Sequence, residues 1–194
     1  RAQKKVESRN FDIRKTLIKF DDVMNDQRRV IFSQRLKILK SKNVEEILED
    51  FLIEVLDNLE LVKNTYQKSN DEKNYLTSTK NATGNVLSDK ELLNIAALSK
   101  EEFIKKIKEL YLSKRKSRIE LVGIDENNAL EKKIFLQIID FTWRSHLQYL
   151  EQLRQVIGLR QYGQKDPLSE FKKEAFNLFE GLLDKIKIDI IKFL

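Results

Sequence analysis

Residues 159–167 read LRQYGQKDP, a short polar stretch with a tyrosine at its centre, between two long amphipathic segments. In the segment before it, apolar residues recur at three- and four-residue steps, the spacing of one helix face: Leu130, Ile134, Ile138, Phe141, Trp143, Leu147, Leu150 and Ile157. The segment after it shows a similar face, formed by Phe171, Ala175, Leu178, Phe179, Leu182 and Ile186. The pattern predicts a helical hairpin with Tyr162 exposed at its tip.

Residues at both ends of this stretch favour helix boundaries. Gly158 is expected to end the first helix in a left-handed conformation, which costs glycine little. Asp166 is expected to cap the second helix. Pro167, the single proline, suits the first helical position, where its missing N–H is not needed. We therefore predict a hairpin loop over residues 158–167.

Composition favours an all-α fold. The 194 residues include only 5 glycines and 1 proline against 35% charged residues, which leaves few turn formers for a β-rich chain. The 41% of hydrophobic residues suffices for a core. The absence of cysteine excludes disulfides and thiolate metal sites, and no apolar run approaches the roughly 20 residues of a membrane span. Because the chain begins with arginine, we expect it to be part of a longer protein.

The first 40 residues predict one long basic helix. They contain 12 basic and 5 acidic side chains, whereas residues 41–128 contain 14 and 17, and residues 129–194 contain 11 and 9. Apolar residues recur every seven positions in two series, Leu17, Met24, Ile31 and Ile38 beside Val6, Ile13 and Phe20. At roughly 1.5 Å per residue the helix is about 60 Å long, more than a small core needs. We expect a bundle member or a self-associating coiled coil, although Asn10 and Gln27 interrupt the apolar seam.

Residues 41–128 are expected to form a separate small helical lobe. Asn43 and Glu46 resemble a capping pair that opens a helix with one apolar face, formed by Val44, Ile47, Phe51, Val55, Leu59 and Val62. Residues from about 63 to 87 are rich in polar side chains and predict a long mobile surface loop. Two capping boxes then predict a short helix followed by a longer one: Ser88 with Glu91, and Ser99 with Glu102.

A search for catalytic groups excludes several kinds of site. None of the five glycines is followed by lysine, so the chain has no phosphate-binding P-loop, and we expect no nucleotide site in it. His146 is the single histidine and has no cysteine or second histidine with which to share a metal. We therefore expect no bound cofactor or metal and interpret His146 as a packed or surface residue.

Two clusters of charged residues could be binding sites, but each also has a purely structural explanation. Asp21, Asp22 and Asp26 could suggest a magnesium site, but Lys19 and Arg29 lie three residues from Asp22 and Asp26, so ion pairing along the helix is favoured and Asp21 is left for a partner. A basic cluster at residues 114–118 could contact nucleic acid, but its surroundings are net acidic, which favours a solvated face.

Two long blocks of sequence resemble a known family. Residues 2–35, AQKKVESRNFDIRKTLIKFDDVMNDQRRVIFSQR, resemble the start of the helical scaffold domain of the SecA family of bacterial preprotein translocase motors. Residues 140–176, DFTWRSHLQYLEQLRQVIGLRQYGQKDPLSEFKKEAF, resemble the two-helix finger of that family. The resemblance implies a scaffold helix over residues 1–40, a helical wing over 41–128 and the finger over 129–194.

The resemblance also implies partners and roles. In the family the finger loop reaches the SecYEG channel and contacts unfolded preproteins, which would give that role to Tyr162 with Arg160, Gln161, Gly163, Gln164 and Lys165. The scaffold helix contacts the nucleotide-binding and preprotein cross-linking domains, a role implied for Arg14, Asp21, Asp22, Asp26 and Arg28. ATP and magnesium would bind in those other domains of the parent. The parent would be an ATPase in the cytoplasm and on the inner face of the cell membrane, with acidic lipids as a peripheral contact.

Two other functions remain open from the residues themselves. A basic helical module could bind nucleic acid, as the charge of the first 40 residues suggests, although the resemblance predicts no nucleic-acid partner. A self-associating helical scaffold could instead close a homodimer through the seven-residue repeat of residues 6–38.

Overall fold

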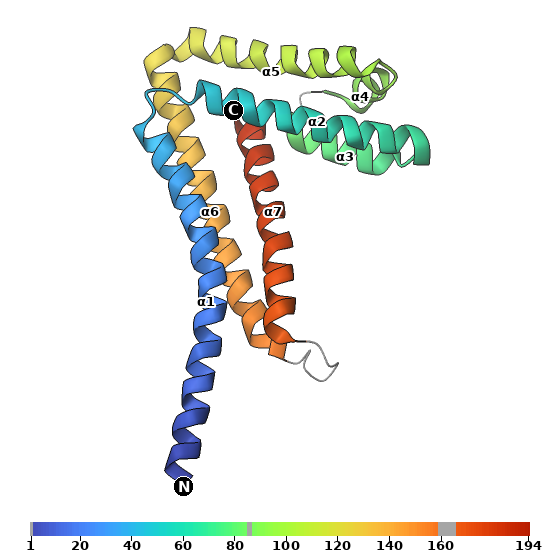
Figure 1. Cartoon of the computed structure of the whole chain (residues 1–194). Helices are drawn as coiled ribbons and strands as arrows, with labels where there is room; N and C mark the ends of the chain where they lie inside the picture. Colours follow the sequence, from blue (N-terminus) through green and yellow to red (C-terminus); the bar gives the residue numbers. More distant parts are fainter. Residues whose placement is uncertain (1, 85–86, 159–165) are drawn as a thin grey trace. The chain divides into compact units, whose positions relative to one another are not determined.

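The computed structural model describes residues 2–84, 87–158 and 166–194 (Figure 1). These residues form seven α-helices and no strand, which confirms the all-α prediction. The helices are α1 (Ala2–Lys40), α2 (Glu45–Ser69), α3 (Glu72–Thr83), α4 (Asp89–Ala96), α5 (Lys100–Val122), α6 (Ile124–Ile157) and α7 (Pro167–Phe193). Among these described helices, none combines the length and the apolar character needed to cross a membrane.

The chain divides into two compact units that are not continuous in sequence. Unit 1 consists of Arg1–Lys37 with Ile139–Leu183, and unit 2 of Ile38–Ile138 with Asp184–Leu194. The three segments predicted from the sequence follow the covalent order of the chain and stay a prediction.

Unit 1 is built from most of α1, the second half of α6 and the larger part of α7. Its core joins all three helices through Phe20, Leu150, Leu153, Ile157, Phe171 and Ala175. Phe20 and Phe171 meet edge to face, with ring centroids 4.9 Å apart, a favoured geometry for aromatic rings. Figure 1 shows α6 and α7 side by side in this unit, with α1 continuing beyond the described end of α6 and start of α7. The predicted hairpin is therefore confirmed for the described residues.

The ends of the hairpin helices match the sequence prediction with one correction. α6 ends at Ile157 and α7 begins at Pro167. Asp166 caps α7: its Oδ2 accepts hydrogen bonds from the Ser169 hydroxyl at 2.6 Å and from the Ser169 backbone N–H at 2.9 Å. These bonds favour the carboxylate and lower the pKa of Asp166. The left-handed conformation predicted for Gly158 is wrong, because positive φ among the described glycines occurs at Gly84 and Gly123.

The buried face of α6 differs from the predicted one. Leu130 and Phe141 are exposed, Phe141 by 70%. In the first half of the helix, the buried residues follow the predicted ones by one position in the sequence. The buried face includes polar residues and consists of Glu131, Phe135, Ile139, Thr142, Trp143, His146, Leu150, Leu153 and Ile157. Apolar residues on this helix are more numerous than one face can bury, so the apolar pattern alone could not select the face.

The buried face of α1 combines members of both predicted series. Phe20, Gln27 and Ile31 are buried, Met24 is partly buried, and Leu17 is exposed. Their spacing of three and four residues is that of a coiled-coil seam. Gln27 therefore occupies a seam position and does not interrupt it, which corrects the prediction.

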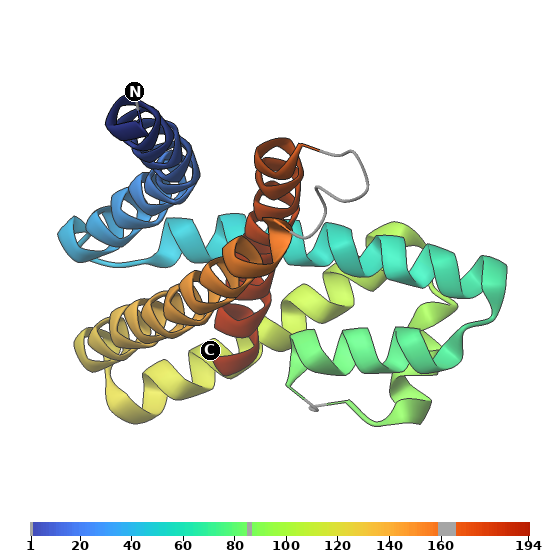
Figure 2. The same cartoon turned by 90° about the horizontal axis from the view of Figure 1, so that it is seen from below.

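Unit 2 contains α2, α3, α4 and α5, together with the start of α6 and the end of α7. Figure 2 shows α2 and α3 lying side by side. Both predicted capping boxes are present: the Glu91 backbone N–H donates to the Ser88 hydroxyl, the Glu102 backbone N–H donates to the Ser99 hydroxyl, and each glutamate accepts from its serine's backbone N–H. The predicted cap at Asn43 is wrong, because Val44 occupies the N-cap position of α2 and makes no side-chain cap hydrogen bond.

The predicted loop at about 63–87 is also wrong for most of its length. α2 continues to Ser69, and α3 follows after a turn at Asn70, whose φ of 57° is left-handed. Two tyrosines pack α2 against α3 within this polar segment: the rings of Tyr66 and Tyr75 stack with their centroids 5.0 Å apart. The Tyr75 hydroxyl donates to the backbone oxygen of Leu92 at 2.8 Å, and burial raises the pKa of Tyr75 to about 12.

Polar side chains in the same segment are satisfied inside the helices. Thr79 is buried, and its hydroxyl donates to the backbone oxygen of Tyr75 at 2.8 Å. Lys63 is 2% exposed and donates to the backbone oxygen of Leu98 at 2.9 Å, with Glu60 at 3.2 Å. Polar composition predicted a loop because it does not reveal that these groups find partners within the fold.

A buried carboxylate organises the basic cluster of unit 2. Glu131 on α6 is fully buried and accepts hydrogen bonds from Arg115 at 2.8 Å and from Arg118 at 2.7 Å. Arg115 also donates to Glu45 at the start of α2, and Arg118 to the backbone oxygen of Leu194. The prediction of a solvated basic face is therefore wrong for these two arginines, which connect α2, α5, α6 and Leu194, the residue after α7.

The pKa of Glu131 reflects two opposing effects. Burial disfavours its charged form, but the hydrogen bond from Arg115 and the charges of Arg115 and Arg118 outweigh burial, so its pKa lies below the ordinary value. A carboxyl with a lowered pKa contributes stability above its unfolded pKa of about 4.3, and that contribution is lost as the pH falls through the folded value.

We predict that Glu131→Gln lowers the free energy of unfolding at neutral pH by about 3 kcal/mol, because Arg115 and Arg118 lose the buried carboxylate that they share. The difference from wild type should shrink in acid, where the wild-type carboxyl is protonated as well. Urea unfolding followed by circular dichroism at neutral and acid pH measures this. Glu120→Gln, at an exposed glutamate 4.0 Å from Lys116, is the control and should change stability by less than about 0.5 kcal/mol. An equal loss of unfolding free energy at both pH values would contradict the conclusion that Glu131 is a carboxylate paired with the two arginines.

A second prediction concerns the core of unit 1. Trp143→Ala should cost about 3–5 kcal/mol, because Trp143 is only 7% exposed and its removal leaves a cavity. Phe141→Ala is the matched control two residues away on the same helix, and its exposed ring should matter little. Thermal unfolding of both variants tests the prediction, and equal losses would show that the wrong face of α6 has been placed in the core.

Candidate functional site: a helical hairpin held on the long helix

The predicted contact residues of the hairpin tip lie outside the described residues. They are Arg160, Gln161, Tyr162, Gly163, Gln164 and Lys165. The described residues instead define how the hairpin that bears them is held, from Gly158 on one side and Asp166 on the other. The site is therefore built from the contacts of α6 and α7 with α1.

Three polar pairs join α1 to α6 within unit 1, and we call them the register pairs. Arg154 donates to Asp21 at 2.9 Å, His146 and Gln27 are hydrogen-bonded at 2.8 Å, and Arg35 donates to Asp140 at 2.9 Å and 3.3 Å. The residue number of the partner on α6 falls as that of the partner on α1 rises, so the two helices are antiparallel. Together the pairs define which residue of α1 faces which residue of α6.

The central pair is buried and extends to the third helix. Gln27 and His146 are each 7% exposed. The Gln27 side-chain NH₂ donates to the backbone oxygen of Ala175 on α7 at 2.9 Å. The Gln27 side-chain oxygen is therefore the group that faces His146, and because it only accepts, Nε2 of His146 is the donor. One glutamine side chain thus connects all three helices of the unit.

The imidazole of His146 lies in an aromatic setting. The ring of Trp143 is 5.5 Å from it, and that of Phe179 is 5.9 Å away, measured between centroids. Burial lowers the pKa of His146, so the neutral form dominates at neutral pH. The described residues contain no group of three histidine, cysteine, aspartate or glutamate side chains placed to hold a metal. The structure thus places His146 as a packed residue, in agreement with the sequence interpretation.

Asp21, which the sequence leaves available for a partner, is paired with Arg154 on α6. Arg154 donates to its carboxylate and also to Glu151 at 2.9 Å, so the guanidinium bridges one acidic residue on α1 and one on α6. The side chain of Asp21 is still 50% exposed. Its contact with another domain stays a prediction.

The other residues predicted to face neighbouring domains lie along α1 without a common contact. Asp26 is 3.6 Å from Arg29, the expected ion pair along the helix, and both side chains are exposed. Arg28 donates to the side-chain oxygen of Asn25 at 2.9 Å. Arg14 and Asp22 are exposed. The described structure does not gather these residues into one site.

The sequence interpretation missed the register pairs. Gln27 follows Phe20 by seven residues, which is the signal that assigns it to the seam, whereas its polar side chain suggests an interruption when the sequence is considered alone. His146 lies within the apolar run of α6, and no short-range pattern links it to a residue 119 positions earlier. Pairing of this kind depends on the tertiary arrangement.

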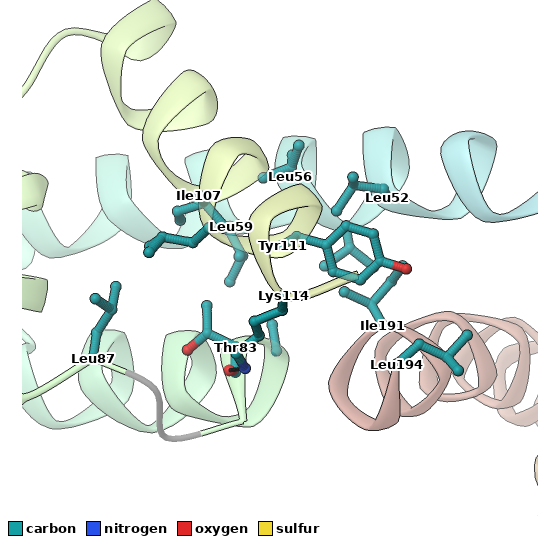
Figure 3. A pocket seen from close by; sticks show the side chains of 13 residues that line it. Leu52, Leu56, Leu59, Thr83, Leu87, Ile107, Tyr111, Lys114, Ile191 and Leu194 are labelled. Carbon is teal, nitrogen blue, oxygen red and sulfur yellow. Dashed lines mark hydrogen bonds between the residues drawn. The ribbon is translucent and has the colours of Figure 1, made fainter. Parts of the chain in front are cut away.

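Unit 2 contains a small cavity of about 30 Å³ between α2, α3, α5 and the end of α7 (Figure 3). Its walls are mostly aliphatic, with Leu52, Leu56, Leu59, Ile107, Ile191 and Leu194 among them. Lys114 lies at this cavity, donates to the backbone oxygen of Thr83 at 3.4 Å, and has a pKa lowered by burial. A volume of this size suits one or two water molecules and is far smaller than the usual pocket for a drug-sized ligand.

We predict that wild-type stability declines as the pH falls below about 6.5, the ordinary histidine pKa. The unfolded state then gains a proton at His146 that the folded state resists, because its pKa is lower. His146→Gln keeps a side-chain NH₂ near Nε2 and removes the titration. Unfolding midpoints measured from pH 7.5 to 5.5 should therefore fall more steeply for wild type than for the variant. Parallel slopes would show that His146 titrates normally.

Comparison with known proteins places the whole chain in one family. The family described as "SecA Wing and Scaffold domain" matches residues 1–194. The chain is similar to "Protein translocase subunit SecA" of Pelagibacter ubique (strain HTCC1062), with 50% identity over 194 residues, and to that of Hyphomonas neptunium (strain ATCC 15444), with 39% identity over 196 residues. Both alignments include all of this chain but only 23% and 21% of the relatives. The chain belongs to the SecA family, within its wing and scaffold region.

Proposed function

We propose that this chain is the part of a protein-translocating ATPase that supports and presents a polypeptide-contacting hairpin. The relatives that match its full length are named protein translocase subunits, and the chain spans less than a quarter of each. In this proposal ATP and magnesium bind in other domains of the parent, and the present chain is a mechanical and regulatory element. The parent acts in the cytoplasm and at the inner face of the cell membrane, where acidic lipids are a peripheral contact.

The observation that best supports the proposal is the way the hairpin is held. α6 and α7 share a core with α1, and one buried glutamine binds both hairpin helices at once. A rigid two-helix projection is suited to bringing a short loop to a fixed place, since functional loops depend on a scaffold that positions them. Residues 158–167 would then reach the SecYEG channel and the preprotein within it.

Tyr162 is the residue that we propose touches the moving polypeptide. A tyrosine ring offers a large amphipathic surface, which can contact varied side chains without requiring a particular sequence. Arg160, Gln161, Gly163, Gln164 and Lys165 complete this contact surface. Along α1, we propose that Arg14, Asp21, Asp22, Asp26 and Arg28 face the nucleotide-binding and preprotein cross-linking domains.

The structure gives less support to a nucleic-acid-binding function. Arg115 and Arg118, the centre of the basic cluster at residues 114–118, are engaged by Glu131 and are not free for phosphate. Self-association through the α1 seam is also less favoured, because Phe20, Gln27 and Ile31 are already buried within the chain.

The direct test is site-specific cross-linking from position 162. A photoreactive residue there, in the full-length parent during transport of a stalled preprotein, should give adducts with the preprotein or the channel. The same residue at Tyr149, which is exposed on α6 away from the tip, is a matched control and should give fewer. Adducts confined to the motor itself would favour a purely structural role.

We predict that Tyr162→Ala in the full-length parent strongly reduces polypeptide transport and leaves basal ATP hydrolysis nearly unchanged, because the residue lies outside any nucleotide site. Tyr162→Phe should retain most transport if contact depends on ring area rather than on a hydroxyl hydrogen bond. Transport and hydrolysis are measured on the same preparations. A parallel loss of basal hydrolysis in Tyr162→Ala would rule out the proposed role.

A further inference from the structure

We propose that Gln27 and His146 are positioning residues that fix the register of the α6–α7 hairpin on α1. Register here means which residue of α1 faces which residue of α6. In fixing it, the pair sets how far along α1 the hairpin presents its loop. The consequence for transport rests on the function proposed above, whereas the register itself is a property of unit 1 and can be measured separately.

Apolar packing alone discriminates poorly between registers of these helices. The seam of α1 follows four-, three- and four-residue steps through Phe20, Met24, Gln27 and Ile31, and the facing surface of α6 follows three- and four-residue steps through Leu150, Leu153 and Ile157. A displacement by one repeat brings the apolar side chains of the α1 seam, Phe20 and Met24 among them, against other apolar side chains of α6. Two amphipathic helices with such repeats accept more than one alignment unless a polar group forbids it.

The buried pair supplies that polar group. In any other register the amide of Gln27 and the imidazole of His146 would be buried without each other, and an unpaired buried polar group is costly. Fixing register is the best attested use of a polar residue in an apolar seam. The distance of 2.8 Å between Nε2 of His146 and the Gln27 oxygen fits one alignment of the two helices.

The two outer register pairs, Asp21–Arg154 and Arg35–Asp140, penalise a change of register much less than the central pair does. The side chains of Asp21 and Arg154 are 50% and 28% exposed, and those of Arg35 and Asp140 are 39% and 43% exposed. Water and salt weaken ion pairs at this exposure, and their long flexible side chains can follow a displaced partner. The central pair is the one whose loss is not compensated by solvent.

Ala175 extends the effect to the second hairpin helix. Its backbone oxygen accepts from Gln27 at 2.9 Å, and the residue is fully buried in the shared core. A methyl side chain lets the amide of Gln27 approach the backbone of α7 closely. The same glutamine therefore sets the position of both α6 and α7 on α1.

The test is a double variant of the full-length parent, Gln27→Met with His146→Leu. These side chains keep much of the volume and remove both polar groups together, a change that buried polar pairs often tolerate without loss of stability. His146→Gln is the conservative control because it retains a donor near Nε2. Met24→Leu is a second control, since it alters seam packing at a partly buried position without changing a polar group.

Spin labels report the register directly. Lys15 on α1 and Arg144 on α6 are both exposed, and the antiparallel register pairs place them well apart along the helix axis. With cysteines at these two positions and none reactive elsewhere in the parent, wild type should give one narrow distance. The double variant should give a broadened or second distance, displaced by about 5 Å for each helical turn of slippage. Both controls should keep the wild-type distance.

Transport provides the second measurement. Polypeptide transported per ATP hydrolysed should fall several-fold in the double variant, at a temperature where thermal unfolding shows that it is folded, and should stay normal in both controls. A merely structural role would lower the unfolding midpoint without changing the distance in folded molecules.

One narrow wild-type distance in the double variant would overturn the proposal, whatever its transport activity. A changed distance with normal transport would support the register assignment and contradict the hairpin function proposed above, so the two failures are distinguishable. If the double variant does not fold, His146→Phe replaces it, because a ring then remains between Trp143 and Phe179 while the donor is lost. An unchanged distance in that variant would overturn the proposal equally.

Discussion

The carboxamide of Gln27 lies where three helices of unit 1 meet, and both of its polar groups are used there. Its NH₂ group binds the backbone of α7 at Ala175, and its oxygen faces Nε2 of His146 on α6. An amide buried among aliphatic and aromatic side chains is tolerated only with such partners, since leaving either group unpaired costs more than the hydrogen bond gains. The two hydrogen bonds of Gln27 therefore restrict how α6 and α7 can pack on α1, and apolar side chains fill the rest of the core around them.

Unit 2 also contains a buried polar group that is stabilised by its partners, but there the group is charged. Glu131 is fully buried, and its cost of burial is offset because Arg115 and Arg118 supply both charge and hydrogen bonds. The two arginines reach outward from there to α2 and to the end of α7, so segments far apart in the sequence share one carboxylate. In each unit the residue that joins the helices is polar and buried, although the apolar residues provide most of the favourable free energy.

Local patterns predicted what local interactions determine. The capping boxes at Ser88 and Ser99, the cap at Asp166 and the position of Pro167 depend on residues within one turn of each other, and the structure confirms them. The buried face of α6, the helix in place of the loop at 63–87 and the role of Gln27 depend on partners far away in the sequence. Composition could not show that Tyr75 reaches Leu92 or that Gln27 reaches His146, because such pairs exist only after the helices have assembled.

If the hairpin contacts many different polypeptides, as proposed above, it cannot rely on its substrate to order it, because no single sequence is present to supply complementary contacts. Its position must be set in advance by the domain that bears it, and preorganisation of this kind removes an ordering cost from each encounter. Apolar packing provides stability but permits neighbouring alignments, whereas a buried polar pair penalises all alignments but one. On the register proposal, that distinction between stability and specificity accounts for a glutamine and a histidine at the centre of a seam that is otherwise apolar.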